Sequence, residues 1–365
     1  MKHLDKRAYR FMESSNVSAT SNKPVPQGKI GILLVNLGTP DASCFWQVRR
    51  FLKEFLSDPR VIETPRIFWW PILHFVILVL HPRRTAKHYA AIWNKETNEG
   101  PLKAITRSQA EKLAAWIGAG GLDPKGQHAA RDKFFIAWAM RYRKPDIAQG
   151  IVSLKEHGCT RILVLPLYPQ YAAATTASAN DKVFETLKAM RWQPAVRVAP
   201  PYFDDRTYID VLATSLRAGL SRLDFVPDTI LVSFHGLPKA EVAKGDPYYD
   251  QCLETWRLLR EDLGLGADRC PVSFQSRFGS REWLQPYTAA MVKSLASQGT
   301  KSLVVIAPGF SADCLETLYE IDVECREIFT ENGGKNFAAI PCLNDSELGM
   351  MLIHDLVARE LKGWI

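Results

Sequence analysis

The sequence predicts an α/β protein made of two Rossmann-like lobes with parallel sheets and a cleft between them. Two observations lead to this prediction. Short apolar runs alternate with amphipathic, helix-like segments, which is the sequence form of strand–helix–strand units. The runs also recur in the same order in the two halves of the chain. Because the crossovers of such units are right-handed, each half is expected to form a doubly wound sheet.

Six apolar runs are the predicted strands. Each contains few polar residues, as expected of strands that are covered on both faces in a parallel sheet. They span residues 31–38, 134–140 and 161–169 in the first half, and residues 229–236, 270–279 and 302–310 in the second half.

The ends of the runs carry the internal repeat. NLGTP at 36–40 corresponds to FHGLP at 234–238. The third run of each half is followed by a small-residue loop that opens a helix, at 171–190 and at 311–329. In open α/β sheets ligands bind beyond the carboxyl ends of the strands. These loops are therefore expected to line the functional cleft.

Composition and charge limit the function classes. The 365 residues are 47% hydrophobic and 23% charged, which is typical of a globular protein. The 46 basic and 39 acidic residues leave a formal charge of +7, which suits an anionic small molecule or a membrane surface. The cations are scattered and form no nucleic-acid-binding motif, so we expect no nucleic acid partner.

Cysteines and short motifs exclude further classes. Seven widely spaced cysteines without a C-x-x-C pair argue against a disulfide framework and against a thiolate metal cluster. Residues 1–27 contain no apolar signal segment and read as a flexible N-terminal tail, so we expect a cytoplasmic protein. The chain has neither a P-loop nor a G-x-S-x-G elbow, and GLGADR at 264–269 follows a helix-like segment, which excludes a dinucleotide site.

The most apolar stretch of the chain spans residues 67–80. As a helix its fourteen residues would reach about 21 Å, which is too short for a hydrocarbon core of about 30 Å. It contains Trp69 and Trp70 and is flanked by arginines, a pattern typical of an interfacial lip against anionic lipid. A buried core helix would give a similar pattern. The sequence leaves both readings open, with peripheral contact to the inner membrane as a hypothesis.

His235 is the histidine whose position most suggests chemistry. It ends the strongly apolar run LVSFH and is followed by Gly236 and Pro238, which predict a sharp turn. An imidazole there is able to stay neutral, accept a proton or bind a metal. The alternative is a hydrogen-bonded core histidine, but the carboxyl end of a strand favours a functional role.

A file of carboxylates marks the helix predicted after residue 310. At 100° per residue its members lie within about 80° of one another, with almost no interleaved cation. Hard oxygen ligands of this kind suit a divalent cation, and a carboxylate with an imidazole suits ferrous iron. The alternative is the solvated face of an amphipathic helix. The carboxylates are Asp313, Glu316, Glu320, Glu324 and Glu327.

Six segments of the chain together resemble one family. LLVNLGTP, AMRY, LPLYPQY, SFHGLP, FQSRFG and APGFSADCLETLYEID, in this order and spacing, are similar to the ferrochelatases over residues 29–360. The resemblance implies two lobes, 28–198 and 199–342, with the metal site on the second. It also implies a C-terminal helix, 343–365, that packs back on the first lobe. The implied activity is that of a lyase that inserts Fe²⁺ into protoporphyrin IX with release of two protons, the last step of haem biosynthesis.

The resemblance also implies roles for individual residues. His235 and Glu316 are implied as the catalytic pair that handles metal and protons, with Glu320 and Glu324 as further metal ligands. Whether His235 is the first proton acceptor or the first metal ligand stays open. The residues implied in porphyrin binding are Leu37, Arg83, Arg84, Lys87, Tyr89, Arg141, Tyr142, Ser276, Trp283, Phe310 and Asp313. Among these, Leu37 favours protoporphyrin over coproporphyrin, and the cations with Ser276 are the candidates for the propionates.

The resemblance further bears on cofactors and partners. Some relatives hold a [2Fe–2S] cluster through cysteines in the loop after PQY and at the C-terminus, but YAAATTAS and LVARELKGWI contain none, so no cluster is expected. Substrate Fe²⁺ and porphyrin are then the expected ligands of a monomer or homodimer. Arg143 stands where glycine is common after the MRY motif. A chelatase for another metal or for coproporphyrin, and a non-catalytic haem or metal carrier, remain alternatives.

Overall fold

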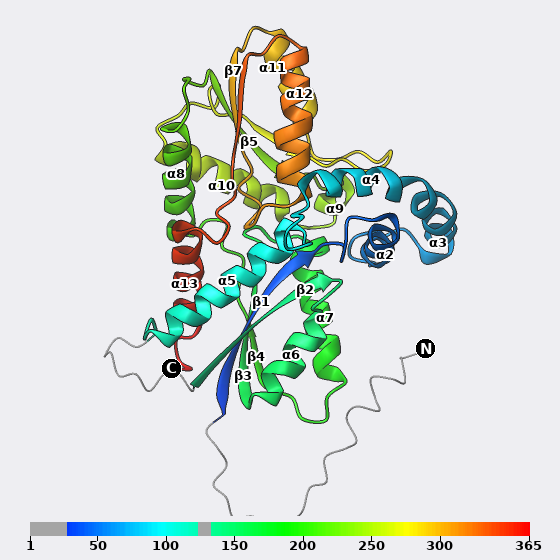
Figure 1. Cartoon of the computed structure of the whole chain (residues 1–365), viewed down its shortest axis with the longest axis vertical. Coiled ribbons are helices and arrows are strands. Elements are labelled where there is room, and N and C mark those ends of the chain that lie inside the picture. The colour runs from blue at the N-terminus through cyan, green and yellow to red at the C-terminus, as the bar shows by residue number, and fades with distance from the viewer. Residues whose placement is uncertain (1–27, 123–132) are drawn as a thin grey trace, which may run out of the picture.

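Two four-stranded parallel sheets form the framework of the protein. The computed structural model describes residues 28–122 and 133–365, so the predicted tail 1–27 lies outside the described residues. The sheets have the strand orders β2-β1-β3-β4 and β6-β5-β7-β8, and Figure 1 shows one above the other. The identical orders confirm the predicted α/β fold with two repeated lobes.

The first sheet consists of β1 (Lys29–Gly38), β2 (Phe134–Tyr142), β3 (Cys159–Pro166) and β4 (Ala195–Val198). The second sheet consists of β5 (Thr229–His235), β6 (Val272–Gln275), β7 (Ser302–Ile306) and β8 (Asn336–Ile340). The prediction found six of these eight strands. It missed β4 and β8, each of which is one of the two edge strands of its sheet, because they are short and not continuously buried.

Alternate residues of β1 supply two separate cores on the two faces of the first sheet. Ile32 and Leu34 pack with α5 (Pro101–Gly118), whereas Leu33 and Val35 pack with α6 (Ile147–Glu156) and α7 (Ser178–Lys188). A strand that is apolar on both faces must be covered on both, which explains why this segment has no alternating pattern.

The second lobe repeats this arrangement around β5. Val232 and Phe234 pack with α8 (Arg206–Leu220) and α10 (Tyr248–Asp262) on one face. Leu231 packs on the other face with α11 (Thr288–Ser297), with α12 (Arg326–Glu331) and with the π-helix η4 (Glu316–Cys325). The short helix α9 (Lys239–Ala243) follows the turn after β5.

The C-terminal helix α13 (Glu347–Glu360) joins the two lobes. Its residues Met350 and Leu356 belong to the same buried cluster as β1, α5 and α8. Beyond it, the guanidinium of Arg161 in β3 donates a hydrogen bond of 2.8 Å to the carbonyl oxygen of Trp364. The last segment of the chain is therefore tied to the first sheet, as Figure 1 also shows.

A helical arm projects from the first lobe beside the junction of the lobes (Figure 1). It comprises α2 (Phe45–Leu56), α3 (Arg66–Ile72), the π-helix η1 (Leu73–Ile77) and α4 (Leu78–Ile92). Ile67, Phe68 and Phe75 are 78%, 67% and 70% exposed. The alternative of a buried core helix for residues 67–80 is therefore wrong. Within the described residues, no helix has the length and apolar character needed to cross a membrane.

In both lobes the third strand leads into a π-helix. η3 (Ala173–Ala177) follows β3 and continues into α7, and η4 follows β7 and continues into α12. π-Helices are rare and are frequently found at functional sites. The internal repeat seen in the sequence thus extends to an unusual local conformation at the carboxyl ends of both sheets.

Candidate active site

His235 is held at the carboxyl end of β5 with one ring nitrogen engaged. Its Nδ1 lies 2.7 Å from the carbonyl oxygen of Gly236. A carbonyl oxygen only accepts hydrogen bonds, so Nδ1 carries the proton in this contact and the neutral ring keeps its lone pair on Nε2. The side chain is half-buried. This backbone contact therefore presents Nε2 as a proton acceptor or metal ligand.

Two aromatic side chains flank this imidazole. The ring centroids of Trp283 and Phe310 each lie 6.4 Å from that of His235, at interplanar angles of 50° and 54°. A Cβ atom on Gly236 would lie 2.8 Å from the carbonyl oxygen of Gln275 and 3.0 Å from the indole ring of Trp283. Glycine is thus required at the turn after β5 for the tryptophan to pack beside the histidine.

Gln275 connects His235 to the acidic helix. The two residues are register partners in the β5–β6 pair. The side-chain amide of Gln275 donates a hydrogen bond of 2.9 Å to the carbonyl oxygen of Glu316, and its own oxygen accepts one of 2.8 Å from Ser233. Gln275 belongs to the FQSRFG motif but was not predicted as a site residue. A polar residue at the end of a buried strand is the sequence feature that could have indicated it.

The file of carboxylates on the second lobe is shorter and wound differently than predicted. Residues 316–325 form a π-helix with i→i+5 hydrogen bonds, not the expected α-helix. Glu316, Glu320 and Glu324 are half-buried members of η4, whereas Glu327 is exposed on α12. The predicted file of five carboxylates is therefore wrong at its two ends, Asp313 and Glu327.

Asp313 is the other member that leaves the file. Its carboxylate is buried and accepts hydrogen bonds from the hydroxyl of Thr317 at 2.8 Å and from the side-chain amide of Asn344 at 2.6 Å. It also accepts a hydrogen bond of 3.3 Å from the backbone N–H of Cys342. These partners use both carboxylate oxygens, so Asp313 holds the start of η4 against the segment that leads into α13.

Burial sets the electrostatics of the remaining carboxylates. It raises the pKa of Glu320 to about 8, and the charge of Glu316 adds to the rise. The Ser276 hydroxyl donates a hydrogen bond to Glu320 and works against it. Burial also raises the pKa of Glu324, although the nearby cation of Arg84 acts to lower it. Glu320 is therefore able to hold a proton near neutral pH.

Ser276 has an unusual backbone conformation at this point. Its φ is 64°, in the left-handed region that a non-glycine residue rarely adopts. The hydrogen bond to Glu320 stabilises this conformation, in which the residue directly after Gln275 turns its hydroxyl to η4. Strained residues of this kind cluster at functional sites.

The arm contributes α4 to the same region. The ring of His88 stacks on that of Tyr319 in η4, with centroids 4.1 Å apart. The guanidinium of Arg84 lies 3.9 Å from the carboxylate of Glu324. Tyr89 is buried, and burial followed by the charge of Glu316 raises its pKa well above the usual value. Arg83 and Lys87 are exposed on the same helix. His88 was not singled out from the sequence.

Leu37 and Phe310 bring the two lobes together. Leu37 ends β1 in the first lobe, Phe310 follows β7 in the second, and both pack on one cluster with Leu102, Ala312 and Cys314. Both side chains are half-buried. Because Phe310 also flanks His235, this cluster forms an apolar wall next to the imidazole.

Arg141 and Tyr142 lie at the end of β2 in a buried network. The guanidinium of Arg141 lies 2.5 Å from the carboxylate of Asp58, which also accepts the Tyr142 hydroxyl at 2.8 Å and the Ser178 hydroxyl at 2.5 Å. Tyr142 is fully buried. The structure therefore places these two predicted porphyrin contacts in an internal network that sequence reasoning missed, with Asp58 at its centre.

The carboxylates do not converge on a resident metal. Among the described residues, no three His, Cys, Asp or Glu side chains are grouped so as to hold a metal ion. A lone imidazole beside a file of separated carboxylates is instead suited to pass ions or protons from one group to the next.

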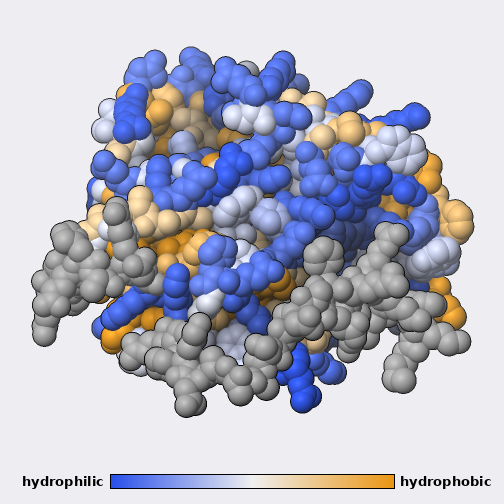
Figure 2. Space-filling model, turned by 60° about the horizontal axis from the view of Figure 1, so that its bottom comes forward, coloured by the Kyte–Doolittle hydropathy of each residue, from blue (hydrophilic) through white to orange (hydrophobic). Residues whose placement is uncertain are grey.

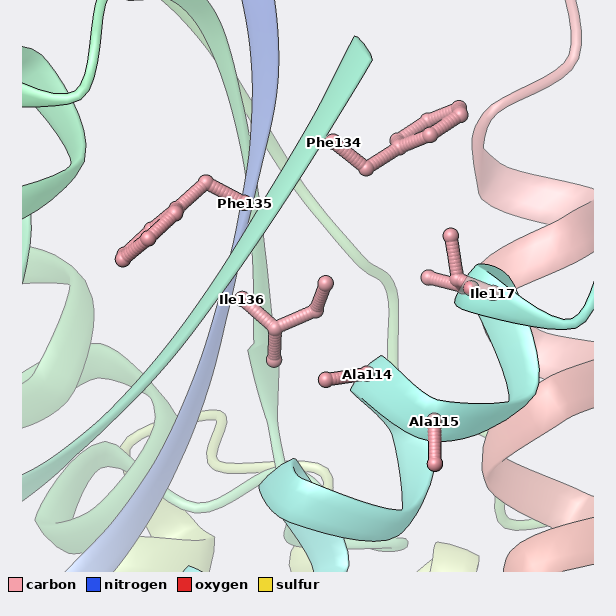
Figure 3. Close-up of a pocket in the computed structure, with 7 residues that line it drawn as sticks. Ala114, Ala115, Ile117, Phe134, Phe135 and Ile136 are labelled. Carbon is pink, nitrogen blue, oxygen red and sulfur yellow. The ribbon is translucent and has the colours of Figure 1, made fainter. Parts of the chain in front are cut away.

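A separate small hollow lies between α5 and β2 in the first lobe. Figure 3 shows Ala114 and Ile117 of α5 facing Phe134 and Ile136 of β2 across it. Its volume is about 290 Å³, and apolar side chains line it. It has no titratable lining side chain and therefore no evident chemistry.

Comparisons with known proteins show to which family the chain belongs. The ferrochelatase family model matches residues 29–361. A ferrochelatase of Methylocella silvestris is 56% identical over 353 residues, which are 96% of this chain and 100% of that protein. A ferrochelatase of Rhizobium meliloti is 54% identical and covers 95% of this chain and 99% of its own.

A solved structure shows the same fold. SirB from Bacillus subtilis with Fe³⁺ matches with a TM-score of 0.53 at 12% identity, covering 92% of this chain and 97% of its own. At this identity the match bears on the fold alone. The resemblance read from the sequence is nevertheless confirmed by the family model and the curated relatives. This chain belongs to the ferrochelatase family, lyases that insert ferrous iron into a porphyrin.

Proposed function

We propose that the chain inserts Fe²⁺ into protoporphyrin IX between its two lobes, with His235 and Glu316 as the catalytic pair. The observation that carries this proposal is the presentation of the imidazole. Nδ1–H is tied to the carbonyl oxygen of Gly236, which leaves Nε2 as a basic nitrogen between two aromatic rings at the end of β5.

The reaction needs the groups found beside this imidazole. A flat porphyrin carries two inner N–H groups, so metal insertion requires a distorted ring and the removal of two protons. Contacts along the rest of the macrocycle are able to drive the distortion. Trp283, Phe310, Leu37 and Tyr89 are the proposed walls, and Arg83, Arg84 and Lys87 on α4 are the proposed partners of the propionates.

The geometry favours His235 as the first proton acceptor. Its Nε2 is a single nitrogen donor, and within the part of the chain that the structure describes no carboxylates converge with it, so it makes a poor metal site on its own. Glu320 is able to hold a proton near neutral pH, and Glu324 follows it in η4, beside Arg84. We propose that protons leave along Glu316, Glu320 and Glu324, and that iron binds these carboxylates when they are deprotonated.

Protoporphyrin IX is the proposed macrocycle because the wall beside His235 is apolar. Leu37 and Phe310 present carbon atoms at the junction of the lobes. Coproporphyrin carries two more propionates than protoporphyrin, and a carboxylate against such a wall would lack a partner. We expect a higher kcat/KM for protoporphyrin in a side-by-side comparison.

We further propose that the arm docks on a membrane surface. We define the lip as residues 66–80, which comprise α3, η1 and the first residues of α4. Eight large apolar residues of the lip are exposed. The surface of a monomeric soluble protein rarely exposes an apolar patch of this size. A hydrophobic porphyrin partitions into lipid, so a lip at the interface would shorten its path to the cleft.

The remaining expectations are proposals as well. We propose an enzyme without a resident [2Fe–2S] cluster, because the two segments that hold it in some relatives contain no cysteine here. Iron analysis and the visible spectrum of the purified protein test this. Light scattering decides whether the protein is a monomer or a homodimer. Limited proteolysis tests the proposed lobe limits, 28–198 and 199–342.

One assay tests the activity. The protein is mixed anaerobically with protoporphyrin IX and Fe²⁺, and the absorbance is followed as the free-base spectrum is replaced by that of haem. Catalytic turnover supports the proposal. Stable binding of porphyrin without metal insertion would instead identify a carrier, and faster insertion of Co²⁺ or Ni²⁺ would identify another chelatase.

A further inference from the structure

A basic hollow lies on the first lobe, apart from the cleft. Its volume is about 550 Å³, and it is lined by residues of α2, the start of α3, the end of β2 and α7. The cationic lining residues outnumber the acidic ones by four. They are Arg50, Lys53, Arg66, Arg141, Arg143 and Lys182, against Glu54 and Asp58.

Both acidic side chains already have a cationic partner within the protein. Asp58 lies 2.5 Å from the guanidinium of Arg141, and Glu54 lies 3.6 Å from that of Arg143. Arg50, Lys53 and Arg66 form neither an ion pair nor a side-chain hydrogen bond with any described residue. The hollow thus gathers three uncompensated cations, which raises the local potential for an anion.

The hollow is separated from the active site by α2. Arg50, Lys53, Glu54 and Ser57 line it at helical spacings of three and four, so they share one face of that helix. Phe51 lies outside this face, and its ring packs on that of Tyr89 with centroids 6.4 Å apart. Of the residues implied in porphyrin binding, only Arg141 also lines the hollow, and its guanidinium is already paired with Asp58.

The hollow adjoins the lip. Arg66, which lines the hollow, is the first residue of α3, and the next two residues, Ile67 and Phe68, are 78% and 67% exposed. In Figure 2, hydrophobic atoms lie at the right margin, the side on which Figure 1 places α3, and hydrophilic atoms lie beside them. A cationic hollow next to exposed apolar side chains matches a phospholipid, which carries a phosphate next to acyl chains.

We propose that this hollow binds the headgroup of an anionic phospholipid while the lip enters the membrane interface. The inference rests on the docking of the lip proposed above. A free phosphate would satisfy the cations equally well, but it would not account for the apolar neighbours of Arg66. The site would orient the arm on the membrane and favour anionic over zwitterionic lipid.

Vesicle flotation of the full chain tests the headgroup site. Vesicles of phosphatidylcholine alone are compared with vesicles that also contain phosphatidylglycerol. The variant carries Arg50→Glu and Lys53→Glu, and the matched control carries the same charge change at Arg222→Glu and Lys293→Glu, exposed residues of the second lobe. We expect the first pair to weaken binding to phosphatidylglycerol vesicles about tenfold or more. The control should weaken it much less, and neither should change insertion in detergent.

A soluble probe separates failure of the hollow from failure of the lip. Binding of dihexanoylphosphatidylglycerol below its micellar concentration is measured by calorimetry for the same proteins. Binding by the unmodified chain but not by the Arg50/Lys53 variant supports the site, even if vesicles are not bound and the docking of the lip fails. Equal weakening of vesicle binding by both double variants would overturn it. So would displacement of the soluble lipid by an equal concentration of inorganic phosphate, which would indicate a free-anion site.

Discussion

His235 and Gln275 are register partners at the carboxyl ends of β5 and β6, and the Gln275 amide also binds the backbone of η4 at Glu316. One β6 residue thereby links the imidazole to the helix that carries the carboxylates. The next residue, Ser276, donates a hydrogen bond to Glu320. The relative positions of base and acids are thus set by rigid strand ends, and this arrangement underlies the predictions that follow.

Replacing the imidazole of His235 should slow metal insertion strongly and leave porphyrin binding nearly unchanged. We expect His235→Gln to lower the rate of haem formation by about 10²-fold or more, the usual contribution of a positioned base. Porphyrin affinity, measured by fluorescence quenching, should change little because the aromatic walls remain. His157→Gln, at the exposed end of α6, is the control. Haem formation by His235→Gln at a rate near that of the unmodified enzyme would count against this role.

Glu320 should limit stability at alkaline pH. Its pKa is raised from 4.5 to about 8 in the folded protein, so the folded state binds more protons than the unfolded state between these values. Its contribution to stability is therefore complete below pH 4.5 and is lost as the pH rises through 8. Glu320→Gln cannot ionise, so it should match the unmodified protein at pH 5 and exceed it at pH 9 by about 1.4 kcal/mol or more.

Denaturant unfolding at the two pH values measures this difference. Glu331→Gln, on the exposed end of α12, is the matched control and should show no pH-dependent gain. The same Glu320 variant should insert iron poorly, since the amide neither binds a cation as a carboxylate does nor carries the proton onward. A stability difference that stays constant with pH would show that Glu320 ionises freely in the folded state.

Asp58 should be a structural centre of the first lobe. Burial opposes its ionisation, but hydrogen bonds from Ser178, the backbone of Arg60 and Tyr142, together with the Arg141 cation, lower its pKa. Its stabilising effect is thus present above the unfolded pKa of 3.8 and is lost as the pH falls through the lower folded value. Asp58→Asn should cost about 3 kcal/mol of unfolding free energy at pH 7, because it leaves Arg141 half-buried without its charge partner.

The exposed pair of Arg60 and Asp181 supplies the comparison for Asp58. Both side chains are more than 40% exposed, so Asp181→Asn should cost less than about 1 kcal/mol. The cost of Asp58→Asn should also shrink in acid, whereas that of a purely steric change would not. Equal effects of the two substitutions at pH 7 would show that the buried network adds no stability.

Two neighbouring parts of the lip should behave differently. Phe68→Ser with Phe75→Ser removes exposed side chains, so it should leave the fold intact and weaken vesicle binding about tenfold or more. Phe184→Ser on α7 is the control for a lost exposed aromatic. Trp69→Ala should instead destabilise the arm by about 2 kcal/mol, because the indole N–H donates to the carbonyl oxygen of Leu56 at 2.7 Å.

Thermal unfolding and flotation on the same samples separate these effects. Vesicle binding unchanged by the Phe68 and Phe75 substitutions would refute the docking of the lip. The structure also shows why Trp69 and Trp70 are unequal as probes. Trp69 packs on the cluster of Leu56, Leu73 and Leu78, whereas Trp70 is 53% exposed.

The sequence predicted the parts of the molecule that depend on continuous local patterns. The apolar strands, their repeat and the position of His235 after a buried run follow from burial on both faces of a parallel sheet. The short edge strands β4 and β8 lack that signal. The acidic stripe was assigned the geometry of a regular α-helix, so the sequence could not show that η4 is a π-helix or that Asp313 turns to Asn344.

The parts that escaped prediction are contacts between distant segments. Arg141 contacts Asp58, which is more than eighty residues away in the sequence, and Ser178, which is more than thirty residues away. No local sequence pattern marks Asp58 as a buried hydrogen-bond acceptor. Gln275 likewise gains its role from a neighbour in space. The lip could be read as core or interface from its composition, and only the exposed side chains of residues 67, 68 and 75 decide between them.

Single-turnover insertion by Glu316→Gln, measured beside its porphyrin affinity, tests the central proposal most directly. The backbone carbonyl that Gln275 binds is retained in this variant, so η4 should keep its position. We predict that protoporphyrin still binds with near-normal affinity while anaerobic haem formation falls about 10²-fold or more. Normal insertion, or a loss of porphyrin binding that matches the loss of activity, would contradict the assignment of Glu316 to metal and proton handling.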